Sequence, residues 1–125
     1  ILDANIWFRY AILPNNATGE SVEWLLKLHN THVIQIYISK ILVEEVQVAL
    51  SRKRALKYLD AAFTDKLYSV FMNLMFAEPV VILPICRDPK DDYLLALAHE
   101  HRLDYLITED KDLLTLGQHH GTRIC

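Results

Sequence analysis

Four carboxylates of this sequence lie where secondary structure elements are predicted to meet. Asp3 follows the apolar pair Ile1-Leu2, and Asp110 follows an apolar run at residues 105–107. Asp91 stands in the first turn of one predicted helix, and Glu45 lies within another. Carboxylates packed together repel one another, and some of them protonate near neutral pH. A hard divalent cation bound through oxygen atoms removes that conflict, so the set predicts an Mg²⁺ or Mn²⁺ site for metal-assisted phosphoryl chemistry.

Glu45 carries the strongest argument of the four. On a helical wheel of residues 41–50, one apolar arc contains Ile41, Leu42, Val46, Val48 and Ala49. Glu45 falls inside that arc, whereas Glu44 and Gln47 fall on the opposite side. A carboxylate that faces a core is costly unless a partner compensates its charge. We therefore expect Glu44 to be solvated and Glu45 to need a partner.

The other three acids also have purely structural explanations. Asp3 can end a strand or cap a helix, and Asp110 can cap a short helix at residues 111–114. Asp91 can interact with free N–H groups at a helix start, and Asp92 is an alternative to it as a ligand. Because these acids belong to separate elements, a shared site explains them jointly. The choice between Asp91 and Asp92 stays open.

Strands and helices alternate along the predicted chain. Apolar and β-branched runs predict strands at residues 1–4, 33–38, 80–83, 105–108 and 122–125. Helices are predicted at residues 5–13, 19–30, 39–50, 55–58 and 61–76, and another begins with Asp88-Pro89. This order predicts an α/β fold with a mostly parallel sheet of about five strands and right-handed crossovers.

Composition limits the classes of protein that are possible. A length of 125 residues, 52% of them apolar, predicts one globular domain over residues 1–125. The net charge of −3 argues against nucleic-acid binding through bulk positive charge. No apolar run approaches the roughly 20 residues of a membrane span, and no signal peptide is apparent. The two cysteines suggest no disulfide framework, so we expect a reduced, cytoplasmic setting.

Four segments resemble the motifs of PIN-domain ribonucleases, a family that supplies many toxins of bacterial toxin–antitoxin pairs. They are Asp3-Ala4-Asn5, the stretch from Ser39 to Glu45, the stretch from Asp88 to Asp92, and the stretch from Thr108 to Leu114. Two positions depart from the family pattern, since Ala4 replaces a Thr and Glu109 replaces a Gly. The similarity covers nearly the whole chain and is closest to small stand-alone PIN proteins described as toxin components.

The resemblance implies a three-layer α/β/α PIN-like fold and a metal-dependent endoribonuclease. The implied catalytic residues and ligands of Mg²⁺ or Mn²⁺ are Asp3, Glu45, Asp91 and Asp110. Asn5 and Thr108 would orient these ligands. Cleavage in the family usually leaves a 5′-phosphate and a 3′-hydroxyl. The implied partners are an RNA substrate and a cognate antitoxin, and a homodimer is a further possibility.

Several basic and aromatic positions have two interpretations. Arg9 and the run Arg52-Lys53-Arg54 can contact RNA phosphates, although a charged surface explains them equally. The six histidines show no metal-ligand spacing, so we interpret them as structural or surface residues. The apolar surplus of the helix at residues 61–76 suggests a dimer or antitoxin interface.

Two other functions remain open. The first is a catalytically silent PIN fold that serves as a binding module, for which Ala4 and Glu109 argue. The second is a phosphatase with an Asp nucleophile. That chemistry usually needs Asp-x-Asp after the first strand, whereas this chain has Asn5 at the second position.

Overall fold

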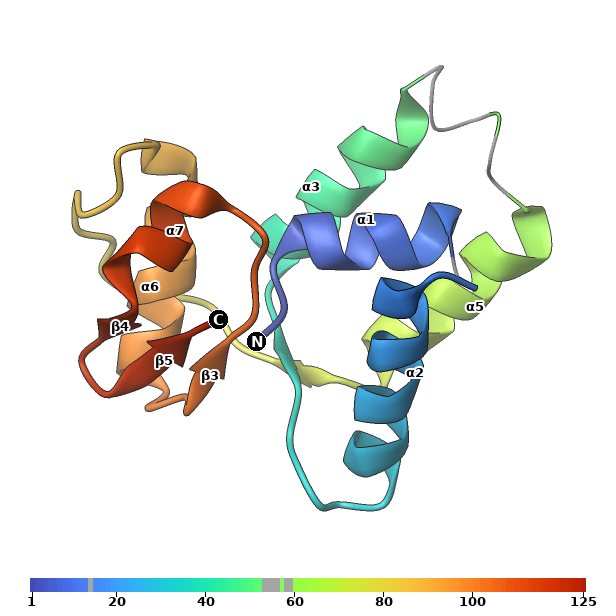
Figure 1. Cartoon of the computed structure of the whole chain (residues 1–125), viewed down its shortest axis with the longest axis horizontal. Helices are drawn as coiled ribbons and strands as arrows, with labels where there is room; N and C mark the ends of the chain where they lie inside the picture. The colour runs from blue at the N-terminus through green and yellow to red at the C-terminus, as the bar shows by residue number, and fades with distance from the viewer. Residues whose placement is uncertain (14, 53–56, 58–59) are drawn as a thin grey trace. The chain divides into compact units, whose positions relative to one another are not determined.

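The computed structural model describes the chain except for residues 14, 53–56 and 58–59 (Figure 1). The chain divides into two compact units. The N-terminal unit is Ala4–Phe76, and the C-terminal unit consists of Ala77–Cys125 together with Ile1–Asp3. No described helix combines the length and the apolar character needed to cross a membrane.

The N-terminal unit is mainly helical (Figure 1). Its helices are α1 (Ala4–Ile12), α2 (Ala17–Asn30), α3 (Lys40–Ser51) and α5 (Ala61–Met72). Two short strands, β1 (Tyr37–Ile38) and β2 (Met75–Phe76), pair in parallel, with Tyr37 opposite Met75. α1 packs against α2, α3 and α5.

Side-chain caps determine where these helices begin. Asn16 accepts a hydrogen bond from Gly19 N at 2.8 Å and starts α2. The Ser39 hydroxyl accepts one from Leu42 N at 3.1 Å, which confirms the predicted start of α3. Such caps satisfy N–H groups that have no partner inside the helix, so local sequence is sufficient to place them.

Aromatic side chains form the core of the N-terminal unit. Trp7 of α1 meets Phe71 of α5 edge-to-face, with the ring centroids 5.1 Å apart. Tyr10 lies one turn further along α1 and is also fully buried. Leu42 and Val46 of α3 close this core without any exposed surface. Edge-to-face contacts between such rings contribute beyond the area that they bury.

The C-terminal unit combines helices with a small sheet. Its elements are η1 (Pro89–Asp91), α6 (Asp92–Glu100), β3 (Tyr105–Leu106), α7 (Lys111–Leu116), β4 (Gln118–His119) and β5 (Thr122–Ile124). The strand order is β3-β5-β4, in which β3 and β5 are parallel and β4 is antiparallel to β5. Leu2 adds a parallel bridge to Ile107, so the chain start lies beside β3. Residues 92–98 of α6 are all buried, as expected of a helix that is covered on every side.

The β4–β5 hairpin was not predicted from the sequence. Its two turn residues, His120 and Gly121, have φ angles of 46° and 88°. A two-residue hairpin turn of this kind needs positive φ at both positions, which glycine adopts without strain and histidine adopts rarely. The His-Gly pair therefore gave only a weak turn signal.

The prediction of an α/β chain is confirmed, but one mostly parallel sheet of five strands is not confirmed among the described residues. The strands lie in two separate small sheets. The strand predicted at residues 33–38 is only Tyr37–Ile38, whereas the one at residues 122–125 is confirmed as Thr122–Ile124. The helix predicted at residues 55–58 falls largely outside the described residues.

Two predicted elements were wrong for identifiable reasons. No strand forms at residues 80–83, because the N–H groups of Val80 and Val81 donate to the Glu100 carboxylate at 2.8 Å each. The helix predicted at residues 61–76 ends at Met72. Asn73 caps it there, since its side-chain amide donates to Ser69 O at 2.9 Å, and β2 follows.

The aromatic core leads to a prediction about stability. Phe71 is 2% exposed and Met72 is 75% exposed, although they are neighbours on α5. Phe71→Ala should lower the free energy of unfolding by about 3–5 kcal/mol, because it removes buried area and leaves a cavity. The control Met72→Ala should change it by less than about 0.5 kcal/mol. Urea denaturation followed by circular dichroism measures both, and equal losses would contradict this core.

The contact of Glu100 with Val80 and Val81 predicts a pH dependence. Hydrogen bonds from the Val81 and Val80 N–H groups hold the pKa of Glu100 below its usual value. The carboxylate therefore stabilises the fold fully above its unfolded pKa of about 4.3, and this contribution disappears as pH falls through the lower folded pKa.

Glu100→Gln should accordingly destabilise the protein at neutral pH, and its difference from the wild type should shrink in acid. Urea denaturation over a pH series measures this difference. Glu44→Gln, which changes another exposed glutamate, is the control. A difference that stays constant from neutral pH to below the folded pKa would contradict the assigned contact.

Candidate active site

Asp3 is a buried carboxylate that the C-terminal unit holds from two sides. Its N–H donates to Ile107 O at 2.9 Å, which places it directly after the Leu2 bridge. The Thr108 hydroxyl donates to Asp3 Oδ2 at 2.7 Å. Asp3 and Thr108 are each only 4% exposed. A carboxylate in such a position is tolerated only when hydrogen bonds or a cation compensate its charge.

Thr108 also connects Asp3 to Asp110. Its Oγ1 atom accepts a hydrogen bond from Asp110 N at 3.0 Å while it donates to Asp3. Asp110 Oδ1 in turn accepts from Asp112 N at 2.8 Å and caps α7. The helix-cap explanation of Asp110 is therefore confirmed. The cap uses one carboxylate oxygen, and it orients the side chain beside the Asp3–Thr108 pair.

The two adjacent acids at the start of α6 have different environments. Asp92 is buried, and its Oδ1 atom accepts from Cys86 N at 2.6 Å and Ile85 N at 3.0 Å. These hydrogen bonds, that of Cys86 first, hold the pKa of Asp92 below its usual value. Asp91 is half-buried, with its Oδ2 atom buried, and its side chain makes no cap hydrogen bond. Asp92 thus anchors the preceding loop, and the two acids differ in burial and in hydrogen bonding.

Cys86 lies within the electrostatic field of these acids. Burial raises the pKa of its thiol to about 12, and the hydrogen bond with Asp92 and the charges of Asp92, Asp91 and Asp110 add to the shift. Asp91 and Asp110 therefore act on the same small region of the C-terminal unit. A thiol with so high a pKa stays protonated at neutral pH, so it is not poised to act as a nucleophile. The sequence offered no signal for this position beyond its residue type.

Glu45 and Asn5 belong to the N-terminal unit. Glu45 is half-buried on α3, between the buried side chains of Leu42 and Val46, whereas Glu44 is exposed as predicted. The wheel was wrong for Val48, which is exposed. Asn5 does not precede α1, because the helix already begins at Ala4; it is an exposed residue within the first turn.

The basic residues proposed to contact RNA are placed only in part. Arg9 of α1 and Arg52, the C-cap residue of α3, are exposed. Lys53 and Arg54 lie outside the described residues. In the C-terminal unit, exposed Arg87 approaches Asp112, with 3.8 Å between Nη1 and Oδ1. An exposed pair of this kind contributes little to stability.

His99 meets His119 and His120, which are about twenty residues away in sequence, in the C-terminal unit. The rings of His99 and His120 stack with centroids 4.1 Å apart, and His119 lies 4.4 Å from His120. Burial, and then the charges of His120 and His99, lower the pKa of His119. Within the described part of the chain, no three His, Cys, Asp or Glu side chains are grouped so as to hold a metal ion.

The donor set nevertheless fits a hard cation by its chemistry. Asp3, Asp91 and Asp110 offer only carboxylate oxygens, and Thr108 connects two of them. Oxygen-only donors suit Mg²⁺ and Mn²⁺ and do not suit the softer metals that prefer sulfur or imidazole. Among the described residues, these acids do not form one closed group.

The Asp3–Thr108 hydrogen bond predicts the effect of substituting Thr108. Thr108→Val keeps the shape but leaves a buried carboxylate without its donor, so the free energy of unfolding should fall by about 1–3 kcal/mol. Thr108→Ser keeps the hydroxyl and should recover most of the loss. Thr115→Val, which removes an exposed hydroxyl bonded to Lys111 O, is the control. Urea denaturation measures all three, and equal losses in Thr108→Val and Thr115→Val would contradict a special role for Thr108.

Comparison with known proteins adds independent evidence. A family model described as PIN domain matches residues 1–112 of the 125. Searches of curated proteins and of solved structures give no match. The matched range includes every acid discussed above. The chain therefore belongs to the PIN-domain family.

Proposed function

We propose that this protein is an endoribonuclease that hydrolyses RNA phosphodiester bonds with the help of Mg²⁺ or Mn²⁺. PIN domains are generally nucleases, and the family model covers residues 1–112. The observation that carries the proposal is the Asp3–Thr108–Asp110 linkage, in which a buried acid is held by a residue that also positions a second acid. Purely structural caps would not require a carboxylate as buried as Asp3.

The proposed metal ligands are the four predicted acids. Asp3, Asp91 and Asp110 come from the C-terminal unit, and Glu45 comes from α3. A bound cation of this type lowers the pKa of a coordinated water and offsets negative charge on a phosphate oxygen. Thr108 orients Asp3 through its hydroxyl, and Asn5 is the second proposed orienting residue.

The structure also suggests how the loop before α6 supports the site. Asp92 fixes Ile85 and Cys86 through their N–H groups, so the turn that carries Asp91 has a defined start. Asp88 caps this turn by accepting from Lys90 N at 3.0 Å. Asp88 caps the turn and Asp92 holds the preceding loop. We therefore propose Asp91 as the metal ligand of this segment.

The finer features of the fold are proposed on the same grounds. The pairs β1–β2 and β3–β5 are parallel, as a PIN-like three-layer α/β/α domain with a mostly parallel sheet requires. We propose that residues 1–125 form one such domain. Arg9, Arg52, Lys53 and Arg54 are proposed to contact RNA phosphates.

The proposed biological role is that of the toxin in a toxin–antitoxin pair. It is supported by the resemblance to small stand-alone PIN proteins, and it makes a cognate antitoxin the expected partner. A homodimer and a cytoplasmic location belong to the same proposal. A catalytically silent binding module is the second candidate, because Ala4 removes a hydroxyl and Glu109 adds a negative charge to the family motifs.

Asp3→Asn tests the mechanism. The amide preserves the shape and can still accept from Thr108, but it removes the charge that a cation needs. Cleavage of single-stranded RNA with Mg²⁺ or Mn²⁺ should fall by more than roughly 100-fold, the upper end of what loss of an outer-shell partner costs. EDTA should abolish wild-type cleavage. Asp65→Asn, a change at an exposed acid of α5, is the control and should cleave normally.

The alternatives give different results in the same assay. Cleavage that persists in EDTA or in Asp3→Asn would exclude the four-carboxylate mechanism. Absence of cleavage by the wild type with any RNA, together with absence of Mn²⁺ binding in calorimetry, would identify the binding module. Hydrolysis of phosphate monoesters without RNA cleavage would identify the phosphatase.

A further inference from the structure

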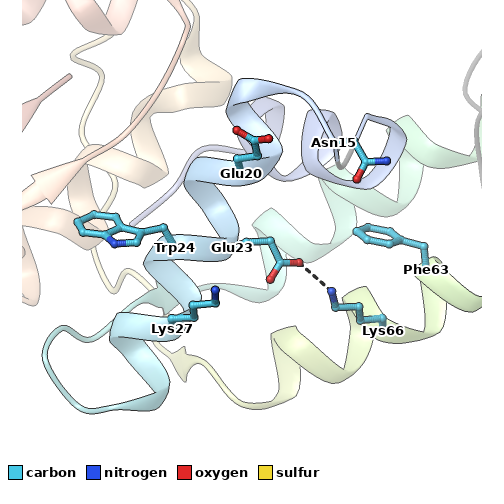
Figure 2. A pocket seen from close by; sticks show the side chains of 7 residues that line it. All are labelled: Asn15, Glu20, Glu23, Trp24, Lys27, Phe63 and Lys66. Carbon is cyan, nitrogen blue, oxygen red and sulfur yellow. Dashed lines mark hydrogen bonds and ion pairs between the residues drawn. The ribbon is translucent and has the colours of Figure 1, made fainter.

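The N-terminal unit contains a hollow of about 470 Å³ that opens to solvent (Figure 2). It lies over α2 and the first half of α5. Its lining residues are Asn15, Glu20, Glu23, Trp24, Lys27, Phe63 and Lys66. Small-molecule sites range from roughly 300 to 1,000 Å³, so this volume suits a ligand of the size of one nucleotide.

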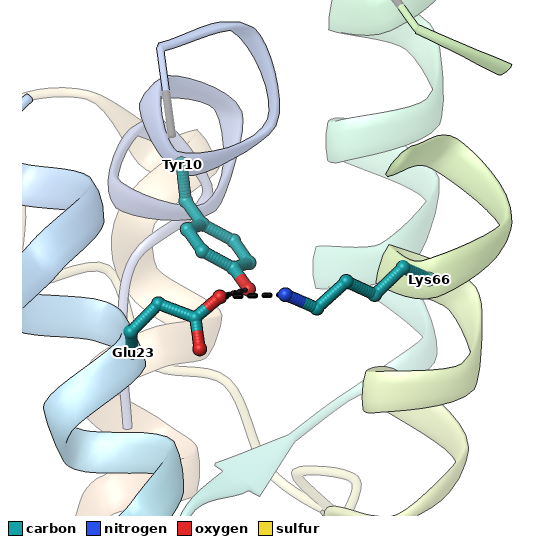
Figure 3. Close-up of polar contacts among 3 residues, drawn as sticks. All are labelled: Tyr10, Glu23 and Lys66. Carbon is teal, nitrogen blue, oxygen red and sulfur yellow. Dashed lines mark hydrogen bonds and ion pairs between the residues drawn. The ribbon is translucent and has the colours of Figure 1, made fainter. Parts of the chain in front are cut away.

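A polar network makes one wall of the hollow rigid (Figure 3). Glu23 Oε1 accepts from Lys66 Nζ at 2.7 Å and from the Tyr10 hydroxyl at 2.5 Å. The bond from Lys66, followed by that from Tyr10, holds the pKa of Glu23 below its usual value. Lys66 also lies 5.4 Å from the centre of the Phe63 ring. Glu23 and Lys66 therefore neutralise each other, and Lys66 lies near the Phe63 ring.

Trp24 and Lys27 of α2 also line the hollow. Trp24 is 60% exposed, although Trp is normally among the more buried residues of a folded protein. Lys27 follows Trp24 by three residues on α2, so both lie on one helix face. Figure 2 shows Glu20 near the opposite end of this face. The hollow thus presents an open aromatic surface beside an ammonium group.

We propose that this hollow binds one nucleotide of single-stranded RNA, with the base stacked on Trp24 and a phosphate beside Lys27. Every base has a π-face, so stacking on an exposed aromatic ring tolerates any sequence. An ammonium group supplies the complementary charge for one phosphate. The site is distinct from the acidic site of the C-terminal unit, and it depends on the proposed function only in taking RNA as the ligand.

The lining differs from the core of a typical protein–protein interface. Four of the seven lining side chains are charged, namely Glu20, Glu23, Lys27 and Lys66. The cores of protein–protein interfaces are depleted in Lys and Glu, and an interface of standard size needs roughly 800 Å² from each partner. A hollow with two aromatic residues among four charges does not match that composition.

Tryptophan fluorescence reports on this site directly. The chain has two tryptophans; Trp7 is 0% exposed and Trp24 is 60% exposed, so quenching by a ligand reports on Trp24. The full chain is titrated with a single-stranded octaribonucleotide in EDTA, where the proposed mechanism allows no cleavage. We expect saturable quenching by the oligonucleotide and none by a heptaglutamate peptide, which carries about the same net negative charge.

Variants separate stacking from charge. Trp24→Ala should weaken binding by roughly 10-fold, measured by fluorescence anisotropy of labelled RNA, whereas Trp24→Phe should retain most of it. Lys27→Gln should reduce the slope of log K against log salt concentration by about 0.7, the value for one phosphate of a single strand. Tyr105→Ala and Arg123→Gln, at exposed positions of the C-terminal unit, are the matched controls. Circular dichroism verifies that each variant is folded.

The outcomes distinguish this proposal from the nuclease proposal. Binding in EDTA that Trp24→Ala weakens by roughly 10-fold supports the hollow whether or not Asp3→Asn still cleaves RNA. RNA binding that is identical in Trp24→Ala and the wild type would overturn the hollow and leave the metal mechanism untouched. Quenching of Trp24 by arginine-rich peptides but not by RNA would assign the surface to a protein partner and overturn the proposal.

Discussion

The hydrogen bond from Thr108 to Asp3 is the interaction on which the candidate site depends. Asp3 is a charged group almost without solvent contact, and burial of a carboxylate is costly unless donors or a cation compensate it. Thr108 supplies one donor, and the same oxygen atom positions Asp110 through its N–H. The bridge between Leu2 and Ile107 brings the two residues together from opposite ends of the chain. The strand pairing thus places the acid, and the hydroxyl determines its orientation.

The acids around the start of α6 have different structural roles. Asp88 caps the 3₁₀ turn, and Asp92 holds the preceding loop by its backbone N–H groups. Two N–H donors replace solvent around the Asp92 carboxylate, which is why its burial is compatible with a lowered pKa. Asp91 is the N-cap residue of α6, and its side chain makes no cap hydrogen bond. Neighbouring residues of one type can therefore have different roles, because the backbone turns them toward different partners.

Interactions within a few residues were predictable from the sequence, and distant ones were not. The caps at Ser39 and Asp110 follow from residue type and spacing, and both are present. The strand expected at residues 80–83 is absent because Glu100, about twenty residues away, takes the N–H groups that a strand would need. Val48 is exposed, although the helical wheel placed it on the core side of α3. The core of the N-terminal unit contacts only part of the apolar face of this helix, and Val48 lies outside that part.

The sequence by itself determined the family, the α/β class and the identity of the candidate acids. Motif spacing and helix caps depend only on residues that lie close together in the sequence, so they can be recognised before the fold is known. Only the tertiary structure decided that Asp92 anchors the preceding loop and that Thr108 joins Asp3 to Asp110. It also brought three histidines together and left Trp24 beside Lys27 in an open hollow. The physical reason is that a hydrogen bond or a ring contact depends on which side chains meet, and residues far apart in sequence meet only when the chain has folded.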